Sequence, residues 1–256
     1  FTHFHTDHVG QAGTLRAVAD PTVHAPTRFQ PRMARDVQDV RRLASETMRA
    51  AGLSEDRIET ALDEVLPQHE AMQAELPVGA VDHWFDAESR VGIGDVELDV
   101  LPTPGHDKTH VSYRLETDGE VALVSGDMAI EPFRTWIVRS GWVDGFADDV
   151  AGFRSALDRL AATDADRVYP GHGPVHDALQ VTVERDRGSL ADRLETCCAA
   201  VPGEGATAAA VAETIGSDRV SFYRLVPEVV AALEDLRKRD RLSGRTVDGA
   251  RRYEPV

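Results

Sequence analysis

The chain has 256 residues, 42% of them hydrophobic and 28% charged, so it can bury a sizeable core and is not a disordered chain. Its 44 acidic and 28 basic residues give a formal net charge of −16, which excludes a uniformly basic surface for nucleic acid. No stretch approaches the ~18 consecutive apolar residues of a transmembrane helix, so we expect no membrane association.

The numbers of cysteines and lysines indicate the compartment and the salt concentration in which the protein works. The two cysteines, Cys197 and Cys198, are adjacent and cannot form a disulfide framework, and the first residues do not resemble a signal peptide. We therefore expect a cytoplasmic protein. Lys108 and Lys238 are the only lysines, against 26 arginines. An acidic, lysine-poor surface suggests a halophilic protein, because carboxylates hold water in high salt; a GC-rich genome is the alternative explanation.

Helical and strand patterns alternate up to about residue 200. A short β-prone segment at 21–24 precedes two helices between 36 and about 75, and Pro67 is expected to bend or end the second. The pattern then predicts a hairpin over 91–101, strands at 110–115 and 121–125, a helix over 150–162, a strand at 167–169 and a helix over 182–200. Strand pairs alternating with helices indicate an α/β fold.

A proline and two glycines at 201–205 predict a domain boundary. We therefore expect a catalytic domain over 1–200 and a small domain over 205–256. In the second, Thr207 is suited to cap a helix ending at Ile215, and a longer helix over 222–239 follows. Residues 241–253 predict strand, turn and strand. Two helices followed by a hairpin are the outline of a winged helix.

The strongest signal for chemistry is the segment Thr2-His3-Phe4-His5-Thr6-Asp7-His8. In an extended strand His3 and His5 share a face, and Asp7 and His8 then lie where the strand passes into a loop. Three imidazoles and a carboxylate so close together predict a metal site. The alternative is a chance cluster of polar surface groups.

Three later segments each predict a strand, a sharp turn and a ligand-type residue. Residues 101–106 end in Pro104-Gly105-His106, residues 123–127 end in Gly126-Asp127, and residues 169–174 present His172 between two glycines. Each signal alone is weak, because a histidine beside glycines is commonly a solvated turn residue.

Together and in this order, these motifs resemble the metallo-β-lactamase superfamily over about residues 1–180. The family pattern is His-x-His-x-Asp-His, then a His after Thr-Pro-Gly, then Gly-Asp and Gly-His. The resemblance implies an αββα sandwich with two metal ions at one edge of its β layers. It assigns His3, His5 and His106 to the first ion, Asp7, His8 and His172 to the second, and Asp127 to the bridge between them.

The resemblance also implies a reaction. Two divalent ions about 3.5–4 Å apart share a water, lower its pKa toward neutrality, and polarise a carbonyl or phosphoryl group. Asp7 is the expected catalytic residue, because it can orient this nucleophile and then move a proton. The five imidazoles and two carboxylates make Zn²⁺ the expected metal, although Fe and Mn also accept such ligands.

The chain departs from the family pattern in two places. The family has about 50 residues of strands before its first His, so we expect that the chain is N-terminally truncated, with an open edge in the first β layer. After His106 the chain has Asp107-Lys108-Thr109-His110, where the family often has Thr-x-Gly-His. We expect Asp107 and Lys108 at the mouth of the site and His110 in a supporting role behind the ligands. The alternative for His110 is a turn histidine with no role in the site.

The C-terminal part resembles the winged-helix domain of hydrolases of the β-lactamase-like protein 2 type, some of which cut RNA. Residues 237–252 contain seven cations and two anions, which gives this segment a charge of +5. The segment is suited to bind phosphates. Alternatively, its arginines are solvated or paired with the acidic body of the protein, which we favour because the whole chain repels nucleic acid.

These observations lead to three hypotheses. The first is a dinuclear metal-dependent hydrolase of a small ester, thioester or lactone, with a small-molecule substrate. The second is an endoribonuclease or phosphodiesterase that uses the same metals and holds RNA on the winged helix. The third is an inactive fragment that acts only as a binding module. The sequence leaves the substrate and the oligomeric state open.

Overall fold

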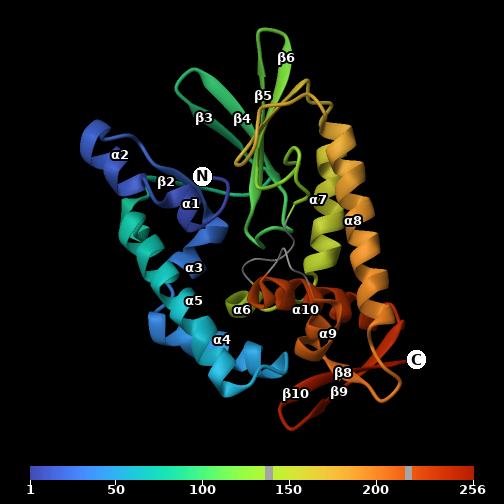
Figure 1. Ribbon diagram of the computed structural model, residues 1–256. Coiled ribbons are helices and arrows are strands. Elements are labelled where there is room, and N and C mark those ends of the chain that lie inside the picture. The colour runs from blue at the N-terminus through green and yellow to red at the C-terminus, as the bar shows by residue number, and fades with distance from the viewer. Residues whose placement is uncertain (136–140, 217–220) are drawn as a thin grey trace.

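The computed structural model describes residues 1–135, 141–216 and 221–256 (Figure 1). Its centre is a five-stranded sheet with the strand order β3-β4-β5-β6-β7. Neighbouring strands are antiparallel, except that β6 and β7 run parallel. The five strands are β3 (Arg90–Ile93), β4 (Val96–Pro102), β5 (Val111–Thr117), β6 (Glu120–Gly126) and β7 (Arg167–Pro170).

Two groups of helices lie on opposite sides of this sheet (Figure 1). On one side, two long helices pack together, namely α7 (Asp149–Ala161) and α8 (Leu179–Ala199). The N-terminal elements on the other side are α1 (Thr6–Val9), α2 (Ala12–Ala19), β1 (His24–Pro26), η1 (Thr27–Phe29), α3 (Gln30–Met33), α4 (Val37–Ala50), α5 (Glu55–Glu75), η2 (Val78–Ala80) and β2 (His83–Phe85). The short helix α6 (Gly141–Asp144) contacts α4.

The C-terminal elements pack beneath α7 and α8 (Figure 1). They are β8 (Ala206–Thr207), α9 (Ala208–Ile215), α10 (Phe222–Lys238), β9 (Leu242–Val247) and β10 (Ala250–Pro255). The three strands form a small sheet with the order β8-β10-β9. The Thr207 hydroxyl accepts a bond from the amide of Ala210 at 3.3 Å, so the predicted helix cap is confirmed.

One large hydrophobic cluster joins these regions. It includes Met48 of α4, Phe153 and Leu157 of α7, and Leu225 and Leu233 of α10. A backbone hydrogen bond also links the C-terminal elements to the N-terminal helices, because the amide of Ala209 in α9 donates to the carbonyl of Ala51, directly after α4, at 2.9 Å. The C-terminal elements therefore share their core with the first 200 residues, and the boundary at 201–205 stays a prediction.

The α/β class is confirmed, and the strands and helices predicted between residues 91 and 200 are present. Among the residues that the structure describes, no helix combines the length and the apolar character needed to cross a membrane.

One local prediction is wrong, and another is narrowed. Residues 1–5 form no strand: the carbonyl of Thr2 accepts one bond from the amide of Val111, and the carbonyl of His5 already begins helix α1. Asp7 and His8 therefore lie on a helix and not in a loop. The helix α5 continues past Pro67, so this proline does not end it, and a bend there stays a prediction. The carbonyl of Asp63, which a proline leaves without its helical donor, belongs to an exposed residue and can be solvated.

Candidate metal centre

The first group of histidines joins the start of the chain to the turn after β4. His3, His5 and His106 are all buried, and one ligand-type atom from each lies within 4.8 Å of the others. Nε2 of His106 is 3.1 Å from Nδ1 of His5. The turn needs Gly105, which has a φ of +153°, because a Cβ there would lie 2.2 Å from Cδ2 of Phe153.

The second group combines helix α1 with the ends of β6 and β7. It consists of Asp7 and His8 from α1, Asp127 directly after β6, and His172 after β7. The parallel register aligns Val124 with Tyr169, and the amide of Gly171 donates to the carbonyl of Gly126 at 2.7 Å. Because β6 and β7 end side by side, their two ligand-type residues meet at the same edge of the sheet.

Asp127 lies between the two groups. Its Oδ1 is 3.0 Å from Nε2 of His8, and its Oδ2 is 3.2 Å from Nε2 of His106 and 3.5 Å from that of His172. Burial by itself would raise the pKa of Asp127, but the bond with His8 and the surrounding imidazoles hold that pKa below its usual value. The carboxylate is therefore ionised and contacts members of both groups.

Burial keeps the imidazoles of His3 and His5 neutral. It lowers the pKa of His5 to about 4, although Asp107 opposes this shift, and it holds the pKa of His3 well below the usual value. A neutral imidazole retains the ring-nitrogen lone pair that a metal ion requires. Nε2 of His3 is buried, has no hydrogen-bond partner among the described residues, and lies 3.8 Å from Oδ2 of Asp127. The donor set thus fits two divalent cations, without indicating which metal.

All seven predicted ligands lie together in the structure. Two neighbouring residues, His110 and Asp107, support them, and the sequence predicted this supporting role for His110 alone. His110 is fully buried; its Nε2 accepts the amide of Asp127 at 3.0 Å, and its Nδ1 is 2.8 Å from the hydroxyl of Thr103. Burial lowers the pKa of His110 to about 3, so the ring is neutral. The supporting role expected for His110 matches this geometry.

The sequence placed Asp107 at the mouth of the site, and this prediction is wrong. Asp107 is buried beneath the first group, where its Oδ2 is 3.3 Å from Nε2 of His5 and pairs with Arg32. Its Oδ1 accepts bonds from the amide and hydroxyl of Thr109, both at 2.7 Å. Burial would raise the pKa of Asp107, but Arg32 and His5 outweigh it and hold that pKa well below normal. The sequence could not reveal this role, because Arg32 is 75 residues away.

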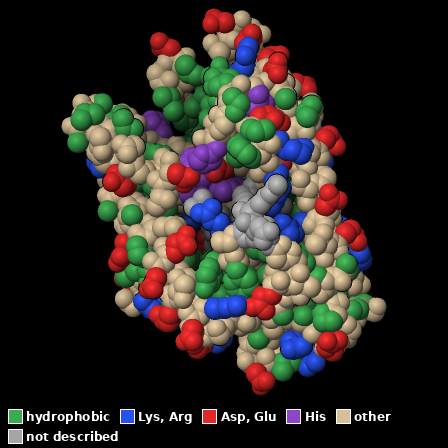
Figure 2. Space-filling view, viewed as in Figure 1, with side chains coloured by type: hydrophobic (Ala, Val, Ile, Leu, Met, Phe, Trp, Pro, Cys, Tyr) green, Lys and Arg blue, Asp and Glu red, His purple; other side chains and the backbone are tan. Residues whose placement is uncertain are grey.

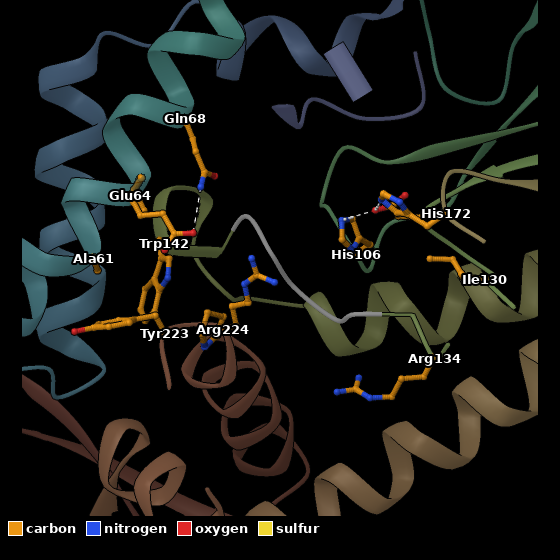
Figure 3. A pocket seen from close by; sticks show the side chains of 13 residues that line it. Ala61, Glu64, Gln68, His106, Ile130, Arg134, Trp142, His172, Tyr223 and Arg224 are labelled. Atoms are coloured by element: carbon orange, nitrogen blue, oxygen red, sulfur yellow. Dashed lines mark hydrogen bonds and ion pairs between the residues drawn. The ribbon is translucent and has the colours of Figure 1, made fainter. Parts of the chain in front are cut away.

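A cavity of about 240 Å³ opens beside the second group (Figure 3). His106 and His172 line one end of the cavity. Residues of α5, α6 and the start of α10 line the rest of its wall. Its apolar lining comes from Ala61, Val65, Ile130, Trp142, Tyr223 and Pro227, and its charged or polar lining also includes Glu64, Gln68, Arg134 and Arg224. In the space-filling view, a group of histidine side chains lies in a hollow near the centre of the face (Figure 2).

The described aromatic residues that follow Asp127 differ in their relation to the cavity. Trp142 lines the cavity, whereas Phe133 is 66% exposed and does not. Trp136 and Ile137 of the same segment lie outside the described residues. The arginines that line the cavity were not predicted, because their position depends on how α10 packs.

The cations of the C-terminal segment are paired. Arg245 binds Glu254 at 2.7 Å, and the guanidinium of Arg252 donates to a backbone carbonyl at 2.7 Å. The others have acidic partners: Arg237 and Arg251 with Glu234, Lys238 with Asp148, Arg239 with Asp235, and Arg241 with Glu195. This arrangement matches the alternative in which the +5 segment is neutralised within the protein.

Comparison with known proteins adds three observations. The sequence profile of the metallo-β-lactamase superfamily matches residues 1–172. A stretch of 102 residues is 30% identical to the β-lactamase-like protein 2 homolog of Caenorhabditis elegans, covering 40% of this chain and 30% of that protein. A stretch of 115 residues is 32% identical to hydroxyacylglutathione hydrolase of Polaromonas sp., covering 44% of this chain and 41% of that protein. These alignments span less than half of either relative.

Two solved structures share the fold over the whole chain. They are a β-lactamase domain protein from Burkholderia ambifaria and a metallo-β-lactamase family protein from Thermus thermophilus. Each has a TM-score of 0.73 at 22% sequence identity and covers 100% of this chain, which in turn covers 73% and 78% of theirs.

Proposed function

Because the chain belongs to the metallo-β-lactamase superfamily, we propose that it is a dinuclear metal-dependent hydrolase of a small ester, thioester or lactone. The observation that carries this proposal is the position of Asp127, whose carboxylate contacts members of both ligand groups. A carboxylate in that position is suited to hold two cations near each other. The resemblance to hydroxyacylglutathione hydrolase is consistent with a thioester substrate.

The ligand groups suggest how two divalent ions would be held. His3, His5 and His106 would hold one ion, and Asp7, His8 and His172 the other, with Asp127 shared between them. When bound, such ions supply an activated water nucleophile and polarise the carbonyl of the substrate. We propose Zn²⁺, because imidazole and carboxylate ligands suit it, with Fe and Mn as alternatives.

The chain's own residues would orient the substrate and move a proton. Asp7 is the proposed catalytic residue, because 38% of its side chain is exposed and its Oδ2 is 3.2 Å from Nε2 of His172. Its carboxylate can accept a proton from the attacking water and deliver it to the leaving group. The apolar side chains of Val65, Ile130 and Trp142 would hold the acyl part of the substrate and exclude water.

The ion pairs of the C-terminal segment favour a small molecule over RNA. A cation already bound to Glu234 or Glu254 must exchange that partner before it can bind a phosphate. Nucleic-acid binding by this segment therefore remains the less favoured alternative.

Finer features of the protein remain proposals as well. We propose that the fold is an αββα sandwich followed by a winged helix, since α9, α10 and the β9–β10 hairpin occur in that order. The cytoplasmic location and adaptation to high salt rest on the acidic, lysine-poor composition.

Metal analysis combined with a substrate panel tests the proposed function. The protein is supplemented with Zn²⁺ or Mn²⁺, and bound metal is counted by elemental analysis. We expect two ions per chain and hydrolysis of acyl thioesters, esters or lactones, with chelator-treated protein as the inactive control. One ion or none, or hydrolysis confined to bis-p-nitrophenyl phosphate and single-stranded RNA, would contradict the proposal.

A further inference from the structure

One wall of the cavity comes from a part of the chain that the family profile does not cover. Tyr223, Arg224 and Pro227 belong to the first turns of α10, whereas the profile ends at residue 172. Facing them are Ala61, Val65 and other residues of α5. The side chains that select a substrate here are therefore partly independent of the predicted metal ligands.

Arg224 supplies a cation to this wall. Figure 3 shows its side chain extending from α10 toward the space between α5 and the histidines. Arg224 is exposed, and among the described residues no hydrogen bond or ion pair engages its guanidinium. Neighbouring arginines differ: Arg134 binds both oxygens of Glu228, at 2.9 and 3.1 Å.

The arginine on the opposite side of the cavity, Arg134, is paired. Its partner Glu228 is buried and also contacts Nε of Arg193 at 3.3 Å. Glu64 is the opposing acidic group on α5, where its Oε1 accepts a bond from Nε2 of Gln68 at 3.2 Å. Two carboxylates line the cavity: Glu64, which is bonded to an amide, and Asp127, which contacts the histidines. Within the described lining, Arg224 is the arginine whose guanidinium has no acidic partner.

On the basis of the proposed function, we propose that Arg224 binds an oxyanion at the end of the substrate remote from the carbonyl that is cleaved. The oxyanion is a carboxylate or a phosphate, both of which a guanidinium binds through two parallel N–H bonds. The apolar residues that line the cavity, among them Trp142 and Ile130, pack against the body of the substrate. The substrate is thus an anionic ester or thioester.

The charge of the whole chain gives a local cation a role in binding an anionic substrate. A net charge of −16 repels anions at long range, and Arg224 offsets part of this repulsion within the cavity. A charge-assisted bond pair to Arg224 would improve binding by roughly 10- to 100-fold.

Binding to chelator-treated protein tests the subsite without the metals. Succinate, inorganic phosphate and the neutral succinamide are titrated in low salt, with the fluorescence of the tryptophans as the signal. We expect saturable binding of succinate or phosphate, weakened about 10-fold or more in Arg224→Ala and retained in part in Arg224→Lys. Arg16→Ala, an exposed arginine on α2, is the matched control. Equal binding by wild type and Arg224→Ala, or no saturable binding of either anion, overturns the proposal.

Hydrolysis by the metal-loaded protein then separates this proposal from the proposed function. Thioesters ending in a carboxylate or a phosphate are compared with their neutral analogues. We expect KM for the charged substrates to rise roughly 10- to 100-fold in Arg224→Ala with little change in kcat, and KM for the neutral analogues to stay constant. If all thioesters are cleaved equally and Arg224→Ala has no effect, the subsite is refuted while the hydrolase stands. If anions bind through Arg224 but no thioester is cleaved, the hydrolase is refuted while the subsite stands.

Discussion

The backbone amide of Asp127 donates a hydrogen bond of 3.0 Å to Nε2 of His110. This bond fixes the tautomer of His110, because a ring nitrogen that accepts leaves the proton on Nδ1, which then donates to the hydroxyl of Thr103. Asp127 is consequently held through its main chain as well as through its carboxylate. Gly126 permits the close approach, since a Cβ there would lie 2.5 Å from Nε2 of His110.

The substitution Asp127→Asn tests whether this carboxylate links the two ligand groups. It keeps the shape of the side chain but removes the charge that offsets two dications. We expect hydrolysis to fall by roughly 10²–10⁴-fold, because the nucleophile is no longer correctly positioned and activated. The measurement is kcat/KM together with metal content. Near-normal turnover with both metals retained would show that Asp127 does not bridge.

The substitution Asp107→Asn tests the buried support of His5. The carboxylate lies 3.3 Å from Nε2 of His5, while Nδ1 of that ring faces His106. Loss of such a partner typically lowers metal affinity by roughly 10- to 100-fold, and we expect this loss in competition titrations with a chelator. Asp99→Asn is the control, since Asp99 also pairs with arginines but lies on the sheet surface. An affinity equal to that of wild type would contradict the role of Asp107.

Replacing Arg245, Arg251 and Arg252 together with Ala tests the C-terminal cations. Because all three already have partners, we expect unchanged hydrolysis of small esters and no RNA cleavage even in low salt. If phosphates did bind there, the salt dependence of RNA binding would flatten by roughly one unit of slope per lost contact. RNA cleavage by wild type that drops in the triple variant would favour the nuclease.

Asp149 should make stability depend on pH near neutrality. Burial raises its pKa to about 7, although Lys108, 3.5 Å away, opposes the shift. A carboxyl whose pKa is higher in the folded state stabilises that state at low pH and loses this contribution as the pH rises through about 7. Asp149→Asn should therefore gain stability relative to wild type between pH 5 and pH 8, by at most about 1.4 kcal/mol per pH unit below pH 7.

Urea unfolding of both proteins across this range measures the effect. The exposed Asp95→Asn serves as the control, for which we expect a constant difference from wild type. A difference between Asp149→Asn and wild type that does not change with pH would show that Asp149 is ionised throughout.

The seven ligand-type residues that the sequence singles out lie together in the structure, and their role as metal ligands stays a prediction. Several of them follow a sharp turn whose glycine has a local physical reason. Gly105 is an example, since its backbone conformation and its contact with Phe153 both exclude a side chain. The strand predicted for residues 1–5 failed because the spacing of His3 and His5 is compatible with any extended segment and does not require a ladder.

Contacts between distant segments could not be predicted. The pairing of Asp107 with Arg32 joins residues 75 positions apart, and an Asp-Lys pair in a polar loop gives no local sign of burial. The position of Arg224 beside the cavity depends on the packing of α10 against the rest of the core. Neither relation leaves a periodic or motif-like trace in the sequence.

Two parts of the chain form the cavity: the ligand-type residues, which would determine the reaction, and the start of α10, which would determine the choice of substrate. The ligand groups come from the edge of the sheet, from α1 and from the residues before α1, while α10 supplies a separate wall of the cavity. Substitutions at Tyr223, Arg224 and Pro227 can accumulate without disturbing the metal centre, so natural selection or laboratory evolution can retarget this scaffold to new substrates by remodelling one helix.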